Sequence, residues 1–165
     1  EVAMFVDKSA RELLYLYDDV LQELRRRKIV RSGTNPVGEL ARYLATRALE
    51  LKVSRDSPME PEFLDADGER YQIRGRRVTR TSQSASFSLG HELEDASFTH
   101  LIGIVFTEDF EILRAGVVPM KIVRNKAILK KGLRGGWRFE LNDEVLEQGE
   151  VKNITQEVRA VVDRL

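Results

Sequence analysis

The sequence contains no cysteine, and this absence removes two classes of site. Without thiols the chain can form neither a disulfide framework nor a thiolate-ligated metal centre. Proteins of the reducing cytosol commonly have this composition, so we expect a cytoplasmic location. The stability of the fold must then come from its packed core.

A long apolar run is also missing. No segment approaches the roughly 20 apolar residues that a helix needs to cross a bilayer. The first residues, EVAMFVDKSA, do not combine a basic leader with an apolar stretch. We therefore expect neither a membrane segment nor a secretory signal, and no membrane partner.

Histidine is scarce, and several catalytic signatures are absent. The chain has two histidines and contains no HExxH motif, no GxSxG elbow and no GxxxxGK loop. Zinc hydrolysis, serine hydrolysis and P-loop nucleotide binding therefore lack their usual sequence features. His100 opens an apolar run, a position more typical of a structural histidine than of a catalytic one.

An excess of one charge is lacking too, since 27 basic residues balance 27 acidic ones. This balance argues against a globally cationic binder of the histone kind and directs attention to local charge. The 165 residues are 42% hydrophobic and 33% charged. This composition suits one globular domain, residues 1–165, with a core of its own.

Hydrophobic spacing predicts both helices and strands. An amphipathic N-terminal helix is expected over residues 9–28, and a second helix after an Asn35 cap with Pro36 at its first position. The run Leu101–Phe106 predicts a strand buried on both faces, and Phe110–Ala115 a returning strand.

The remaining expectations are a short helix over 119–125, a strand over 137–141, and terminal helices capped by Asn142 and Thr155. Segment 54–61 is an irregular connection, whereas Ser82–Ser88 fits either a strand or a loop. This order predicts a single α/β (α+β) domain.

The segment DADGERYQIR, residues 65–74, is the most informative stretch of the chain. Asp65, Ala66, Asp67 and Gly68 match a type I turn closed by a left-handed glycine, the usual three-residue hairpin loop. In that register Asp65 opposes Glu69.

The register of this hairpin decides which side chains share a face. With the three-residue loop, Leu64 faces Arg70 and Glu62 faces Gln72, so that Glu62, Gln72 and Arg74 lie on one surface. A two-residue turn at Asp67 and Gly68 would instead pair Glu62 with Ile73 and separate the polar groups.

This hairpin resembles a small group of prokaryotic proteins with the pattern GYDAxDxDGxRxQIKGRR, which in turn resembles the PD-(D/E)xK superfamily of restriction endonuclease-like folds. From Leu64 to Arg77 the chain reads LDADGERYQIRGRR and keeps the pattern. It departs at two positions, because Glu62 replaces the aspartate of GYDA and Arg74 replaces the lysine of QIK. The resemblance extends from Gly38–Glu39 to the segment 137–141, but only the hairpin is specific.

The resemblance implies a mixed central sheet flanked by helices and a Mg²⁺ site that acts on DNA. Carboxylates would hold the metal, which activates a water and neutralises charge on the scissile phosphate. Glu39 and Glu62 would be the metal ligands, with Gln72 as a neutral polar partner. Arg74 cannot act as a general base and would clamp the phosphate.

Each of these residues also has a simpler interpretation. Glu62, Gln72 and Arg74 can form an exposed hairpin face with a solvated charge pair. Glu39 lies in the first turn of its helix, where an acid is favoured by the helix dipole alone.

Basic residues gather in two places. Arg76, Arg77 and Arg80 follow the hairpin strand, near several hydroxyl side chains, and suit contact with a nucleic-acid backbone. Lys130 and Lys131, with Arg134 and Arg138, can extend that surface. The alternative is a solvated strand edge whose charges prevent sheet-to-sheet aggregation.

These observations lead to two functional hypotheses. The first is a Mg²⁺-dependent deoxyribonuclease with a degenerate active site, which could act as a homodimer as restriction-type enzymes often do. The second is a catalytically inactive domain of the same fold that binds DNA or a protein partner.

Overall fold

The structure is a computed structural model that describes residues 2–33, 35–54, 61–90, 93, 96–132 and 135–165. Its elements along the chain are η1 (Val2–Phe5), α1 (Ala10–Arg26), α2 (Val37–Ala48), β1 (Lys52–Val53), β2 (Phe63–Leu64), β3 (Arg70–Arg77), β4 (Ser86–Gly90), β5 (His100–Phe106), β6 (Ile112–Pro119), α3 (Met120–Lys126), β7 (Ile128–Lys130), β8 (Gly136–Glu140), α4 (Asp143–Leu146), β9 (Lys152–Asn153) and α5 (Thr155–Val162). Residues 55–60 of the expected connection and Arg134 lie outside the described part.

The strands form two sheets. The larger has the order β1-β2-β3-β5-β6-β9, and the smaller has the order β4-β8-β7. Within the large sheet β3 and β5 run parallel, whereas the other neighbours are antiparallel. The predicted α/β domain with a mixed sheet is therefore confirmed.

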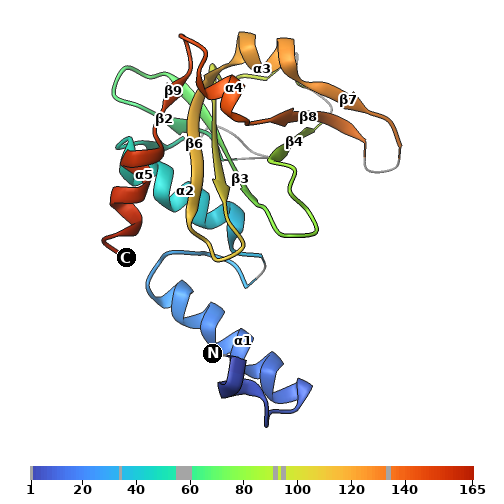
Figure 1. The fold of residues 1–165 in the computed structure, drawn as a ribbon. Helices are drawn as coiled ribbons and strands as arrows, with labels where there is room; N and C mark the ends of the chain where they lie inside the picture. Colours follow the sequence, from blue (N-terminus) through green and yellow to red (C-terminus); the bar gives the residue numbers. More distant parts are fainter. Residues whose placement is uncertain (1, 34, 55–60, 91–92, 94–95, 133–134) are drawn as a thin grey trace.

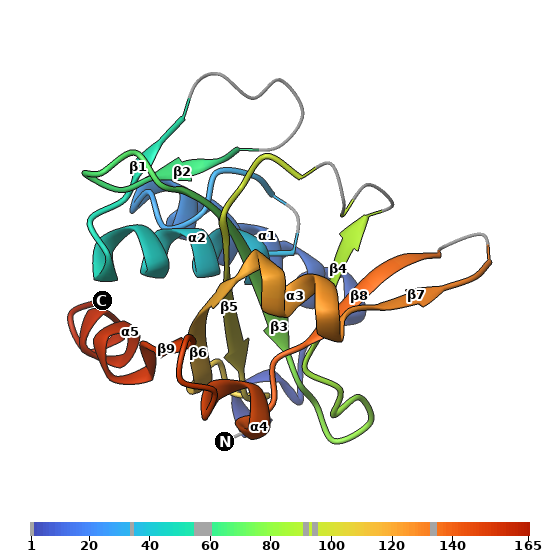
Figure 2. The same ribbon diagram turned by 90° about the horizontal axis from the view of Figure 1, so that it is seen from above.

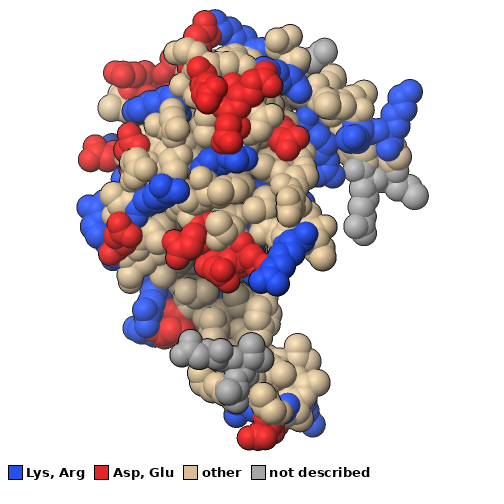
Figure 3. Space-filling view, in the orientation of Figure 1, with Lys and Arg blue, Asp and Glu red and all other residues tan. Residues whose placement is uncertain are grey.

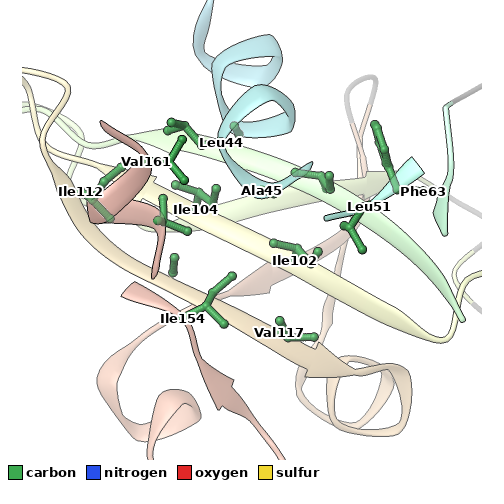
Figure 4. Packing of buried hydrophobic residues seen from close by; sticks show 14 of the residues in the cluster. Leu44, Ala45, Leu51, Phe63, Ile102, Ile104, Ile112, Val117, Ile154 and Val161 are labelled. Carbon is green, nitrogen blue, oxygen red and sulfur yellow. The ribbon is translucent and has the colours of Figure 1, made fainter. Parts of the chain in front are cut away.

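Helices and the small sheet cover opposite faces of the large sheet (Figures 1 and 2). On one face, α2 and α5 pack against β3, β5 and β6. Figure 4 shows Leu44 and Val161 from these helices near Ile104 of β5, and Ala45 of α2 near Ile102. On the other face, β4, β8, α3 and α4 enclose a second core around Phe87. Strand β5 contributes to both cores, which confirms the predicted doubly buried strand.

Two glycines allow the small sheet to approach the large one. Gly103 of β5 pairs with Gly116 of β6. A Cβ atom on Gly103 would lie 2.7 Å from the Phe87 ring, and one on Gly116 would lie 2.7 Å from Leu146. Any larger side chain would therefore displace the second core.

Helix α1 is well formed but largely uncovered. Ser9 caps it through a capping box with Glu12, as its sequence favours. At its other end Lys28 has φ 60, and the Ile29 N–H donates to the Leu24 carbonyl at 3.0 Å. Leu21 is the one buried residue of α1, and Figure 1 shows the helix leading away from the sheets. The helix predicted over residues 9–28 is present, yet most of its apolar stripe faces solvent.

The other predicted elements are confirmed with shifted ends. The strand expected over 110–115 begins two residues later and continues to Pro119, and Asn142 caps α4 as expected. Thr155 is the first residue of α5 rather than its cap, because its hydroxyl bonds Ala115 of the neighbouring strand. Of Ser82–Ser88, the last three residues belong to β4. None of the described helices is long and apolar enough to span a bilayer.

Candidate functional site

The hairpin that connects β2 and β3 has the predicted three-residue loop. Gly68 has φ 82, and the Asp65 N–H donates to the Glu69 carbonyl at 3.2 Å. The Asp65 carboxylate accepts the N–H groups of Asp67 and Glu69 at 3.0 and 2.9 Å. Leu64 pairs with Arg70. The three-residue register is therefore confirmed, and the alternative two-residue turn is not formed.

Tyr71 joins the two arms of this hairpin. Its hydroxyl donates to Asp65 at 2.8 Å, and its ring stacks on His100 with centroids 5.3 Å apart. Burial, followed by the hydrogen bond to Asp65, raises the pKa of Tyr71. The same hydrogen bond, aided by the loop N–H groups, outweighs burial and lowers the pKa of Asp65. Both groups therefore keep the protonation states that hold the loop closed at neutral pH.

Glu62 lies inside the molecule and is held by protein donors. Its residue is 7% exposed, and the register of β2 and β3 places it opposite Gln72. Arg70 donates to one carboxylate oxygen of Glu62 at 3.0 Å, and the Ser97 hydroxyl donates to the other. We call Glu62, Arg70 and Ser97 the Glu62 cluster. Both oxygens of this carboxylate thus have partners within the chain.

Gln72 and Arg74 share the face of β3 that carries the Glu62 cluster. Ile73, between them, points into the opposite core beneath α2. Gln72 is 8% exposed, and the Arg74 guanidinium donates to the Ser88 carbonyl of β4 at 3.1 Å. Arg74 therefore connects the large sheet to the small one.

Glu39 occupies the other side of the large sheet. It lies on α2, which packs on the face defined by Ile73 and Gly75. Its carboxylate accepts the N–H groups of Arg31 and Ser32 and the Ser32 hydroxyl, each at 3.1 Å. Burial raises the pKa of Glu39, but these donors outweigh it and hold the pKa below its ordinary value.

The structure therefore brings Glu62, Gln72 and Arg74 to one face and does not bring Glu39 to them. Within the described ranges, no group of three or more histidine, aspartate or glutamate side chains is arranged to hold a metal ion. A Mg²⁺ ion prefers several anionic oxygens and an octahedral shell. Among the residues that the structure describes, the face of Glu62 supplies one carboxylate and one neutral amide, and these two groups do not meet that requirement.

The arginines after the hairpin mostly stabilise the fold. Arg76 donates to the Ser84 carbonyl at 3.1 Å and to the Ser82 hydroxyl at 2.9 Å. Arg77 donates twice to the Glu108 carbonyl and stacks over Phe110 at 4.4 Å. Arg80 is exposed and lies 3.6 Å from the Glu108 carboxylate. Of these three arginines Arg80 is the most exposed, and the nearby Glu108 carboxylate offsets its positive charge.

Lys130 and Lys131 are placed differently. Every residue of β7 is exposed, and Lys131 follows it. Figures 1 and 2 show the β7–β8 hairpin extending from the body, and Figure 3 shows basic side chains gathered on it. Ile128 pairs with Arg138, so Lys130 and Arg138 lie on the same face of this hairpin.

Sequence reasoning missed the partners of Glu62. Arg70 could have been found, because the predicted register already placed it on the same face as Glu62. Ser97 is 35 residues away along the chain and had no signal, since only the tertiary fold brings it to the carboxylate. No protein-family model matches the sequence, and comparison with curated proteins finds no similar sequence.

Proposed function

We propose that this chain is a nucleic-acid-binding domain of the restriction endonuclease-like type whose carboxylate face does not hydrolyse DNA. Three observations support the absence of hydrolysis. Both oxygens of Glu62 are bonded within the chain, Arg74 is bonded to a main-chain carbonyl, and Glu39 serves a loop beyond the sheet. A metal-activated water would require several anionic ligands, and within the described ranges this face supplies only the Glu62 carboxylate.

The β7–β8 hairpin is the proposed contact surface, and its exposure is the observation that carries the proposal. Lys130, Lys131 and Arg138 stand on an arm that leaves the body, where a charged backbone can reach them. A two-stranded ribbon of this kind fits the major groove of duplex DNA. The exposed Ile128 and Leu129 add apolar surface beside the cations.

Duplex binding at several salt concentrations tests the contact surface. We expect the variant Lys130→Gln/Lys131→Gln to bind about tenfold more weakly than the wild type, because it loses two phosphate contacts. Its plot of log affinity against log salt should be shallower by about 2. Fluorescence anisotropy with a labelled duplex measures both quantities.

Lys152→Gln is the matched control, since Lys152 is an exposed lysine on β9, an edge strand of the large sheet, whereas β7 and β8 belong to the small sheet. It should bind like the wild type. Binding by the wild type that does not respond to salt, or an equal loss in Lys152→Gln, would refute the hairpin as the contact surface.

Plasmid cleavage tests the absence of hydrolysis. With Mg²⁺ or Mn²⁺ we expect no cleavage by the wild type, because the Glu62 carboxylate is already bonded to Arg70 and Ser97. Gel electrophoresis of supercoiled DNA detects nicking. Cleavage that disappears in Glu62→Gln would establish the competing function, a metal-dependent nuclease, for which the common face of Glu62, Gln72 and Arg74 is the favouring observation.

A further inference from the structure

A pocket of about 820 Å³ lies between the end of α1, helix α2 and the β1–β2 edge. Figure 2 shows these elements on the side of the molecule away from the β7–β8 hairpin. The pocket is thus separate from the surface proposed above to contact nucleic acid. It is also separate from the Glu62 cluster, which lies on the other face of the large sheet.

Basic side chains dominate the lining of this pocket. Among the described residues the lining includes six cations, namely Arg25, Arg26, Lys28, Arg31, Arg42 and Arg47, and one carboxylate, Glu39. We call this site the cationic pocket. The chain as a whole has no net charge, so composition does not account for this concentration. Converging cations in a concave, partly apolar site raise the local potential and attract anions.

Helix-terminal stabilisation explains only part of the set. Arg25 and Arg26 belong to the last turn of α1, where cations are favourable for the helix dipole. Arg47 likewise belongs to the last turn of α2, whereas Arg31 comes from the loop between the two helices and Arg42 from the middle of α2. Their convergence from separate segments requires another reason.

Internal ion pairs leave much of this charge unused. Glu23 binds Arg26 at 2.7 Å, and Arg47 lies over the Tyr43 ring at 3.5 Å. In the part of the chain that the structure describes, no hydrogen bond or ion pair involves the side chains of Arg25, Lys28 or Arg31. Glu39, the one acid, already accepts three hydrogen bonds from the loop that carries Arg31.

Lys28 occupies a backbone position that usually belongs to glycine. It ends α1 in the left-handed region with φ 60, closed by hydrogen bonds from Lys28 to Arg25 and from Ile29 to Leu24. A side chain there costs conformational energy that glycine would avoid. This strained residue is one of those that line the cationic pocket.

Apolar groups complete the wall. Ile29, Val53 and Pro61 line the pocket, and Val53 is 43% exposed. The Arg47 guanidinium over Tyr43 adds a flat surface. A ligand that combines several negative charges with a planar ring would use both parts of this lining.

We propose that the cationic pocket binds a phosphorylated nucleoside, either as a free nucleotide or as the phosphorylated end of a nucleic-acid strand. Arg31, Lys28 and Arg25 contact the phosphate groups. The base lies against Val53, Ile29 and the stacked pair Arg47–Tyr43. This site is independent of the β7–β8 hairpin, so either proposal can fail without the other.

Calorimetric titration with four probes tests the site: adenosine triphosphate, inorganic triphosphate, and a short oligonucleotide with either a 5′-phosphate or a 5′-hydroxyl. We expect adenosine triphosphate to bind more tightly than inorganic triphosphate, because the base contributes. Arg31→Gln should weaken binding about tenfold, the usual effect of one charge-assisted contact. Lys152→Gln is the matched control that removes an exposed lysine of β9, outside both the cationic pocket and the β7–β8 hairpin, and it should bind like the wild type.

Lys28→Gly separates binding from folding. It relieves the left-handed strain, so it should unfold at the same or a higher temperature while it binds adenosine triphosphate about tenfold more weakly. Preference for the 5′-phosphate oligonucleotide over its 5′-hydroxyl form, together with weak binding of the free nucleotide, would identify a strand end as the ligand. Tight binding of adenosine triphosphate together with weak binding of both oligonucleotides would identify a free nucleotide.

Three outcomes overturn the inference. The first is no binding of any probe below millimolar concentration, and the second is unchanged binding in Arg31→Gln. The third is inorganic triphosphate binding as tightly as adenosine triphosphate, which removes the nucleoside from the proposal. Loss of duplex binding in the hairpin variant with retained nucleotide binding leaves this site intact.

Discussion

At the residue scale, small side chains decide how closely the two sheets approach. Gly103 and Gly116 face each other across β5 and β6, and the Phe87 ring lies over Gly103. The space that a Cβ would need at Gly103 is filled on one side by Phe87 and on the other by Leu141, 3.1 Å away. This pair of positions therefore sets the distance between β4 and the large sheet.

We expect Gly103→Ala to lower the free energy of unfolding by about 1–3 kcal/mol, because overpacking forces Phe87 to move. Urea denaturation followed by tryptophan fluorescence gives this value. Gly149→Ala is the control, since no atom lies within 4 Å of the Cβ position there and the change should stay within about 0.5 kcal/mol. Equal stability of the two variants would show that the core accommodates the added methyl group.

Glu39 provides a second test at the residue scale, through pH. Its pKa is lowered in the folded chain, so its stabilisation is fully present above the ordinary value of 4.5 and is lost as the pH falls through the lowered value. Glu39→Gln should therefore lower the free energy of unfolding at pH 7 by about 1 kcal/mol, and this difference should shrink on acidification.

Urea denaturation of the wild type and Glu39→Gln across the acidic range checks this expectation. Glu144→Gln is a useful comparison, because Glu144 has its pKa lowered mainly by one exposed bond to Lys126 rather than by a loop. If the difference in free energy of unfolding between Glu39→Gln and the wild type does not change with pH, the negative charge of Glu39 does not stabilise the loop of Arg31 and Ser32. The shape of the side chain would then account for the difference.

At the element scale, strands and helices with local signals were predictable. The Asp65–Gly68 turn fixed the β2–β3 register, and the run Leu101–Phe106 indicated β5, because turn geometry and burial depend on neighbouring residues. Strand β7 was missed, since its residues are all exposed and show no alternation. Thr155 was wrongly assigned as a cap, because its contact with Ala115 joins residues far apart in the sequence and leaves no local signal.

The features of the candidate site likewise fall into those with a local sequence signal and those that depend on long-range packing. The common face of Glu62, Gln72 and Arg74 follows from strand alternation and was predicted. The separation of Glu39 from that face was not, because the side of the sheet that α2 covers depends on packing between distant segments. The donors to Glu62 and the cationic pocket depend on such packing as well.

Helix α1 should behave as a separate unit in hydrogen exchange. Leu21 is its one buried residue, whereas β5 is buried from Leu101 to Phe106. We expect amides of α1 to exchange by local opening, faster than those of β5, which require global unfolding. Mass spectrometry of exchanged peptides compares the two segments. Equal protection would indicate that the apolar face of α1, including Tyr17 and Val20, is covered in solution.

At the scale of the whole molecule, zero net charge hides local concentrations of basic groups. Basic groups are concentrated on the β7–β8 hairpin and in the cationic pocket, while acidic and basic groups are interspersed over much of the face that Figure 3 shows. The two basic regions lie on different sides of the large sheet and involve different elements. Composition alone could not reveal them, because it averages over the surface.

The pairing of β9 with β6 at the edge of the large sheet determines when the chain can complete its core during synthesis. Strand β9 pairs with β6, and Val158 and Val161 of α5 enter the same core as Leu44 of α2. This core therefore joins segments more than a hundred residues apart and stays open to solvent until residues 152–162 emerge from the ribosome. Nascent chains stalled before that point should expose α2 and β6 to chaperones, whereas longer ones should bury them.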